Sequence, residues 1–217
     1  MARKRKKPVE RAAVPDRYAA FAEHPRFGQG PRVTGLDPKP SGAVQPGEAL
    51  TVLHWHSPGR KRIPNTAVVA NWRKQTFTVL PVTHYFDTAR TCRDCGLEFI
   101  FYALEQQHWY EELGFSLDAD CVRCVACRKI DQARAAQRRR YETLLHAPQR
   151  SDEESLEMAE CCMALVEAAL FSPRQLERVR MVLNATAATA SSKLQKRREH
   201  LRERIAAFAA RPAGPPR

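Results

Sequence analysis

Short stretches in the first half of the chain have the residue pattern of β-strands. Polar and apolar residues alternate at 51–55 and 76–80, and a short β-branched run lies at 66–70. Residues 24–50 are rich in glycine and proline, which favours turns and extended chain. We therefore expect residues 23–85 to form a small, irregular β-rich segment.

The second half of the chain instead repeats apolar residues at the spacing of amphipathic helices. This spacing predicts a helix over residues 129–146, which Pro148 ends. Residues 151–210 have the helical pattern throughout, and Ser151 with Glu154 forms a capping box at their start. The C-terminal part of the chain is therefore expected to be helical.

These patterns divide the chain into four parts and predict an α+β fold. Residues 1–22 include a block of basic residues that repel one another, so we expect a disordered tail there. The β-rich segment at 23–85 follows, and residues 86–147 hold a cysteine-rich segment with a basic helix after it. Residues 148–217 hold the remaining helices and end in a second disordered tail.

The composition is that of a globular and basic protein. Of the 217 residues, 43% are hydrophobic and 28% are charged, and the net charge of +12 attracts polyanions such as nucleic acid. No apolar run is long enough to span a membrane, and none follows the basic N-terminus, so we predict neither a membrane partner nor a secretory signal. We expect a cytoplasmic protein whose cysteines are reduced.

Five of the seven cysteines lie in two groups with the spacing of metal ligands. They are Cys92 and Cys95, followed by Cys121, Cys124 and Cys127. Two C-x-x-C elements a few tens of residues apart match a tetrahedral zinc site, and four thiolates would leave no position open for water. A dithiol redox site needs a thioredoxin-like βαβ pattern, which the flanking sequence lacks. The spacing therefore predicts structural Zn²⁺.

Two pairs of cysteines could supply the other two ligands, because Cys121/Cys124 and Cys124/Cys127 have the same spacing. A zinc tetrathiolate carries a net charge of about −2, which nearby cations favour. Arginines flank Cys124 and Cys127, whereas aspartates precede Cys121, and a helix begins near Cys127. We predict Cys92, Cys95, Cys124 and Cys127 as ligands, with Cys121 as the alternative.

The stretch CRDCGLEFIFYALEQQHWYEELGF and the later RCVACR resemble the bacterial "probable zinc-ribbon" family. Its members show C-x-x-C, an F-x-F strand, an E-Q dipeptide opening a helix, a G-F turn and R-C-x-x-C-R. Here these features fall at Cys92/Cys95, Phe99/Phe101, Glu105/Gln106, Gly114/Phe115 and Arg123 to Arg128. The chain departs from the family by extra residues before the last pair and by Cys121. The resemblance implies a zinc-binding fold and no established activity.

The residues between the two cysteine groups are consistent with such a small module. Residues 98–101 have the character of a strand, and residues 103–113 that of a helix that Gly114 ends. So short a unit has too little core to fold alone, and zinc would supply the missing free energy, on the order of 10 kcal/mol. We expect a central zinc ribbon or, given the helix after Cys127, a treble-clef-like variant of it.

Three histidines offer other chemistry. His54, His56 and His84 are candidates for a second metal site or a general base, and the first two would share one face of a strand. No carboxylate sits at a recognisable spacing from them, so ordinary hydrogen-bonded or exposed histidines are the plainer interpretation. The sequence contains no nucleophile elbow, phosphate-binding loop or dinucleotide fingerprint. We therefore predict that the protein is not an enzyme.

Partner binding is the function that these observations favour. We first expect a protein that binds nucleic acid or a ribonucleoprotein through basic surfaces, with structural zinc holding its fold together. The candidate phosphate contacts are Arg134, Arg138, Arg139 and Arg140. The alternative is a protein-interaction adapter whose C-terminal helices bind a partner, with the zinc module as a platform. An enzyme that uses His54, His56 or His84 ranks third.

Overall fold

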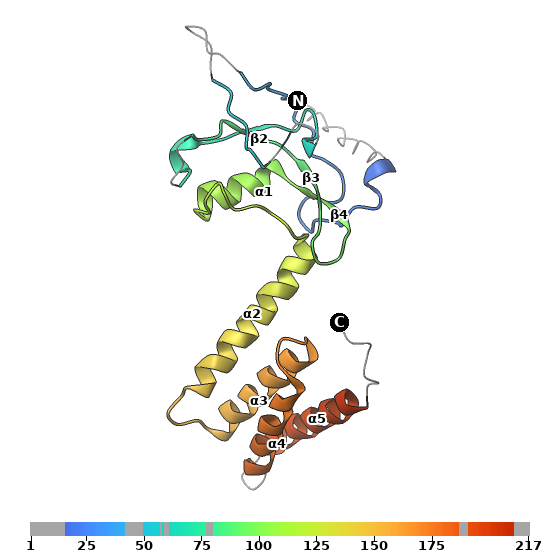
Figure 1. Ribbon diagram of the computed structural model, residues 1–217, viewed down its shortest axis with the longest axis vertical. Helices are drawn as coiled ribbons and strands as arrows, with labels where there is room; N and C mark the ends of the chain where they lie inside the picture. The colour runs from blue at the N-terminus through green and yellow to red at the C-terminus, as the bar shows by residue number, and fades with distance from the viewer. Residues whose placement is uncertain are drawn as a thin grey trace, which may run out of the picture. The chain divides into compact units, whose positions relative to one another are not determined.

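The structure is a computed structural model, and it consists of two compact units that meet in sequence at Arg128 and Lys129. It describes residues 16–41, 50–56, 58, 61–76, 80–186 and 191–210. Most of the predicted basic tail and the whole predicted C-terminal tail lie outside these residues. The predicted α+β class is confirmed, with small antiparallel sheets in the first unit and helices in the second (Figure 1). The four-part division of the chain stays a prediction.

Two short antiparallel sheets form the framework of the first unit. Strand β1 (Val68–Val69) pairs with β2 (His84–Tyr85), and β3 (Thr88–Thr91) pairs with β4 (Glu98–Phe101). The second pair is a hairpin in which Thr91 lies opposite Glu98. Single 3-10 turns flank the sheets at η1 (Asp16–Tyr18) and η3 (Trp72–Lys74). Strand β4 confirms the strand that the sequence predicts at residues 98–101.

The β3–β4 hairpin is buried on both faces. Ile100 and Tyr102 pack with aromatic residues near the start of the described chain, whereas Phe99 and Phe101 pack against buried cysteines. Successive residues of a strand point to opposite sides, so a strand covered on both sides needs an unbroken apolar run. This explains why the sequence EFIFY continues with apolar residues where an ordinary half-exposed strand would alternate.

The predicted helix over residues 103–113 is present in two parts. Helix α1 (Ala103–Gln107) continues as a π-helical turn, η4 (His108–Glu112). Gly114 follows with a φ of 68°, a left-handed conformation that glycine adopts without the steric cost of a side chain. This turn directs the chain toward the second group of cysteines.

The predicted strand at residues 51–55 is wrong. In this stretch only Leu53 forms a bridge, with His84. The N–H of Val52 donates to the side-chain Oγ1 of Thr83 at 3.0 Å, and the carbonyl of Val52 accepts from the backbone N–H of Thr83 at 2.8 Å. A side chain thus takes the place of a backbone acceptor, which interrupts a regular ladder of backbone hydrogen bonds.

The other two β-like runs are shorter than the sequence suggests. The run at 66–70 contains only the two residues of β1. In the run at 76–80, Thr76 forms a single bridge with Ser116, and residues 77–79 lie outside the described residues. The irregular character predicted for this region is therefore present, with less strand than expected.

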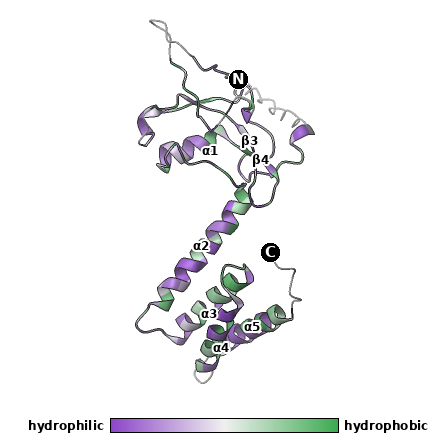
Figure 2. Cartoon of the chain, in the orientation of Figure 1, coloured by the Kyte–Doolittle hydropathy of each residue, from purple (hydrophilic) through white to green (hydrophobic). Residues whose placement is uncertain are grey.

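Helices make up the second unit, as the apolar spacing predicts. Helix α2 (Val125–Leu145) begins in the first unit and continues into the second. It is followed by α3 (Asp152–Glu167), the 3-10 turn η5 (Pro173–Gln175), α4 (Leu176–Ala185) and α5 (Ser192–Ala209). None of the helices within the described residues is both long and apolar enough to cross a membrane. Figure 2 shows that the middle of α2 is strongly hydrophilic.

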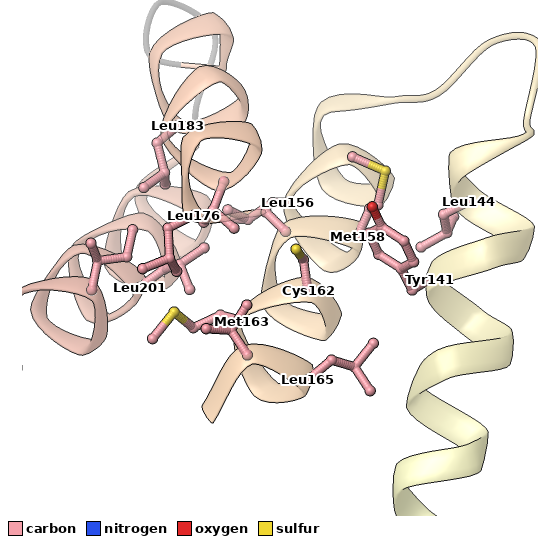
Figure 3. Close-up of a cluster of buried hydrophobic side chains, with 14 residues drawn as sticks. Tyr141, Leu144, Leu156, Met158, Cys162, Met163, Leu165, Leu176, Leu183 and Leu201 are labelled. Carbon is pink, nitrogen blue, oxygen red and sulfur yellow. The ribbon is translucent and has the colours of Figure 1, made fainter. Parts of the chain in front are cut away.

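One apolar core holds the second unit together. Its side chains come from the end of α2 and from α3, α4 and α5, and Leu156, Met163 and Leu201 lie within it (Figure 3). The predicted capping box begins α3: the Ser151 Oγ accepts from the Glu154 N–H at 3.2 Å, and the Glu154 carboxylate accepts from the Ser151 N–H at 3.0 Å. Both bonds satisfy N–H groups that the first helical turn leaves free.

Candidate metal centre

The first two cysteines lie in the tight turn that joins β3 to β4. The N–H of Cys92 donates to the carbonyl of Leu97 at 2.8 Å, which closes the hairpin, and the N–H of Gly96 donates to the carbonyl of Cys92 at 2.9 Å. Gly96 has a φ of 74°, in the left-handed region that favours glycine. The turn thereby brings Cys92 and Cys95 to one side of the hairpin tip.

The other two ligands that we predict lie at the start of α2. Cys124 immediately precedes the helix, Cys127 is in its first turn, and the N–H of Arg128 donates to the carbonyl of Cys124 at 3.0 Å. The N–H of Arg93 donates to the carbonyl of Val122 at 2.9 Å, which joins the hairpin turn to the segment before the helix. A C-x-x-C pair at a helix start places both sulfurs beside free N–H groups of the first turn.

The four sulfurs form one cluster. The Sγ atoms of Cys92, Cys95, Cys124 and Cys127 all lie within 4.8 Å of one another, and those of Cys95 and Cys124 are 3.9 Å apart. A tetrahedron with Zn–S bonds of about 2.3 Å has edges of about 3.8 Å, so this spacing fits a zinc tetrathiolate. The structure thus brings together the four predicted ligands and leaves Cys121 outside the cluster.

The surroundings of Cys92 and Cys121 shift the pKa values of their thiols in opposite directions. Burial disfavours the Cys92 thiolate, but backbone N–H groups of Cys95, Cys124 and Asp94 outweigh that effect and lower the pKa of Cys92 to about 6. Burial raises the pKa of Cys121 to about 12. The Cys121 Sγ lies 3.4 Å from the carbonyl of Arg123 and donates to it as a thiol. The neighbouring Cys124 thiol raises the pKa of Cys127 as well, so the position of Cys121 outside the four-sulfur cluster, and not its pKa, makes it the poorer ligand.

Residues 86–136 match the family model of a probable treble clef domain. The match covers the hairpin with its cysteine turn, the helical turns after it and the beginning of α2. The match is consistent with the zinc-ribbon-like domain that the sequence predicted, and it agrees with the treble-clef-like variant that the helix after Cys127 suggested. No curated protein and no solved structure matches the chain.

The donor set of this treble clef domain fits zinc. Four soft thiolate donors in a tetrahedral arrangement suit Zn²⁺, and they leave no coordination position open. The domain and its cysteine cluster therefore support a structural zinc-binding role. The bound ion would supply folding free energy to a module whose own core is small.

Two arginines are sequence neighbours of the cluster cysteines, and each pairs with a carboxylate. Arg123 binds the Asp94 carboxylate with an N–O distance of 2.7 Å, which ties the first cysteine turn to the second segment. Arg128, next to Cys127, binds Glu105 of α1 at 2.5 Å, and its guanidinium lies 5.0 Å from the ring centroid of Trp109. The Arg128–Glu105 pair thus fixes α1 against the start of α2.

The E-Q dipeptide that opens α1 has a structural role in both positions. Glu105 binds Arg128 and also lies 3.7 Å from the Nε2 of His24. The buried Gln106 amide donates to the carbonyls of Phe86 and Phe101 at 2.6 and 2.9 Å. The dipeptide was visible in the sequence as a family feature, but its partners were not, because they lie far from it along the chain.

The three candidate histidines make ordinary hydrogen bonds. The Nε2 of the buried His54 lies 2.8 Å from the carbonyl of Leu117, and that of His56 lies 3.1 Å from the carbonyl of Asp118. The Nδ1 of His84 lies 2.9 Å from the Oγ1 of its neighbour Thr83. The four cysteines are the only metal-binding group found among the described residues, so no second metal site is found there.

The four candidate arginines of α2 differ in their surroundings. Arg138 pairs with Glu142 one turn later at 3.0 Å, and Arg140 binds both carboxylate oxygens of Glu157 at 2.7 and 2.6 Å. Arg134 and Arg139 are exposed. Of the four, Arg140 thus has a structural role in holding α3.

Proposed function

We propose that this protein is a cytoplasmic, non-catalytic binder of nucleic acid or a ribonucleoprotein, in which structural zinc stabilises the treble clef domain and the basic part of α2 contacts phosphates. The observation behind this proposal is the exposure of α2. Every residue from 129 to 140 is exposed, so three turns of this helix have no buried face. A helical segment with no buried face gains little from packing and needs another reason to be present.

The charge of this stretch indicates the kind of partner. Residues 129–140 hold five basic side chains and one acidic side chain. Zinc with four thiolates lowers the net charge of the protein only from +12 to about +10. Phosphate contacts by such residues release condensed counterions from nucleic acid, which favours binding at low salt. The Nε2 atoms of His54 and His56 lie against protein carbonyls, so these hydrogen bonds lend no support to the enzyme alternative.

The proposal is tested by the salt dependence of binding to labelled duplex DNA, duplex RNA and single strands, measured by fluorescence anisotropy on the full chain. On a duplex, we expect log K to fall against log salt with a slope of about −0.9 for each phosphate contact. A flat salt dependence, or no binding at low salt, would contradict the proposal.

A matched pair of double variants locates the contact. Arg134→Glu with Arg139→Glu changes two exposed side chains of α2, and Arg174→Glu with Lys196→Glu makes the same charge change at exposed positions elsewhere in the second unit. We expect the first pair to weaken duplex binding at least about tenfold and to reduce the magnitude of the salt slope by about two contacts. Equal losses in both pairs would indicate a general charge effect and would contradict a specific role for α2.

A protein-interaction adapter is the second candidate. A groove between α4 and α5, partly lined by the apolar residues Leu183 and Ile205, favours it. Affinity capture with and without nuclease distinguishes the two. Partners that remain bound after nuclease treatment favour the adapter, whereas partners lost on nuclease treatment favour nucleic-acid binding.

A further inference from the structure

A groove of ≈ 310 Å³ lies between α4 and α5 on the second unit. The two helices both pack against α3 and contact each other less. The apolar residues that line the groove are Leu183, Ile205, Ala206 and Ala209. Ala206 and Ala209 are exposed and small, so α5 presents a shallow apolar strip where larger residues would fill the space. The strip continues from the core, because Leu183 and Ile205 also belong to the core cluster.

Basic side chains flank this apolar strip on both helices. Arg180 and Asn184 line it on α4, and Arg202 lines it on α5. Arg180 pairs with Glu177, whose side chain is 72% exposed and free to be displaced. Arg202 and the Asn184 amide have no hydrogen-bond or ion-pair partner within the described part of the chain. The groove therefore offers an unpaired cation and an unpaired amide next to apolar surface.

A buried arginine adds positive charge below the same region. Arg198 lies one helical turn before Arg202 and is 6% exposed. Its Nη2 donates to the carbonyl of Leu183, a residue of the groove, at 2.8 Å. Its Nε has no partner, and no carboxylate pairs with this side chain, among the residues that the structure describes. A buried charge without a counterion attracts an anion to the nearby surface, because screening there is weak.

We propose that this groove binds an acidic amphipathic helix of a partner protein. Apolar side chains of that helix, spaced three and four residues apart, lie on the alanine strip, and its carboxylates pair with Arg180 and Arg202. An apolar floor with basic rims matches this ligand better than a phosphate backbone, which has no apolar face to bury. The groove residues of α5, from Arg202 to Ala209, span about 10 Å, so about two turns of the partner helix make contact. This inference does not depend on nucleic-acid binding by α2.

The test uses the full zinc-loaded protein and two fluorescent peptides of about 16 residues with the same leucine and alanine spacing. One peptide has Glu and Gln at its polar positions, and the other has Lys and Gln. We expect the acidic peptide to bind with a Kd of about 10–100 µM at low salt and the basic peptide at least about tenfold more weakly.

Matched variants locate the binding site. Arg202→Glu should weaken binding of the acidic peptide about tenfold, whereas Lys196→Glu, the same charge change elsewhere on α5, should weaken it less than about twofold. Ala206→Trp fills the groove and should abolish binding, whereas Ala207→Trp, outside the groove, should leave it unchanged. All four positions are exposed, so unfolding midpoints close to that of the natural chain are expected and serve as a check of folding.

Four results would overturn the proposal: no binding of the acidic peptide, equal binding of both peptides, equal effects within either matched pair, or retained binding in Ala206→Trp. Sedimentation gives a further outcome, since self-association that Ala206→Trp abolishes would identify a second copy of this chain as the occupant. A loss of nucleic-acid binding in Arg202→Glu with unchanged peptide binding would assign the groove to phosphate recognition instead. These expected results for the groove are the same whether or not α2 binds nucleic acid.

Discussion

The Sγ atoms of Cys95 and Cys124 lie 3.9 Å apart, although 29 positions separate the two residues in the sequence. The hairpin turn presents the first sulfur, and the start of α2 presents the second. The backbone hydrogen bond from Arg93 to Val122 and the ion pair between Arg123 and Asp94 hold these two segments together. The arrangement therefore requires long-range contacts in addition to the two local C-x-x-C turns.

The choice between Cys121 and Cys127 gives a direct prediction. Cys127→Ala removes a sulfur from the cluster and should lower the zinc content of the purified protein, whereas Cys121→Ala removes a thiol outside it and should leave one zinc bound. Metal analysis of the two variants, prepared side by side, provides the measurement. Loss of zinc in Cys121→Ala with retention in Cys127→Ala would reverse the assignment.

The left-handed conformation of Gly96 gives a second prediction. Gly96→Ala places a side chain at a φ of 74°, which should cost about 1–2 kcal/mol and weaken zinc binding by about tenfold or more. Gly114→Ala is the matched control, since Gly114 also has a positive φ but lies outside the cysteine turns. It should lower stability without a comparable loss of zinc affinity, as competition with a chelator can measure. Equal zinc affinities of the two variants would count against this view of the turn.

The Glu105–Arg128 pair predicts a stability difference between two glutamates of the same helical region. Glu105→Gln removes a charge whose side chain is 11% exposed and should lower the free energy of unfolding by about 2 kcal/mol. Glu112→Gln removes the partner of Lys74 in a pair that is about half exposed, where solvent screening makes the expected change much smaller. Denaturant unfolding of both variants tests the difference, and similar values would show that the Glu105 pair contributes little.

Burial of His54 predicts a specific dependence of stability on pH. Burial and the neighbouring His56 lower the pKa of His54 to about 4, so the unfolded chain binds a proton that the folded chain does not. Stability from this group is complete above the ordinary histidine pKa of about 6.5 and falls as the pH drops toward 4, by up to about 1.4 kcal/mol per pH unit.

His54→Gln removes this titration and keeps a donor for the Leu117 carbonyl. We expect its free energy of unfolding to fall less steeply than that of the natural chain between pH 6.5 and 4, and comparing the two slopes cancels the acid sensitivity of the zinc site, which both proteins share. Parallel slopes would show that His54 remains able to bind a proton in the fold.

Local sequence signals predicted those parts of the fold that local interactions determine. The capping box at Ser151, the strand at residues 98–101 and the glycine after residue 113 all act within a few residues, and all are present. The C-x-x-C turns belong to the same class, because spacing alone brings two sulfurs together. The start of α2 near Cys127 was also visible, and it distinguished the two candidate ligand pairs.

The features that the sequence did not reveal depend on partners distant along the chain. Residues 51–55 alternate as a strand does, but the N–H of Val52 donates to the side-chain Oγ1 of Thr83. In a regular strand this N–H would donate to a backbone carbonyl of the neighbouring strand. The burial of both faces of β4 and the pairing of Glu105 with Arg128 likewise require knowledge of which segments meet. Sequence patterns predict the tendency of a segment, whereas such pairings are set by the fold.

X-ray absorption at the zinc edge, measured on the purified full chain, tests the central claim of this account most directly. The account predicts one zinc per chain with four sulfur neighbours at about 2.3 Å. A chain that folds fully without metal, or a zinc site with nitrogen or oxygen in place of one or more sulfurs, would contradict it.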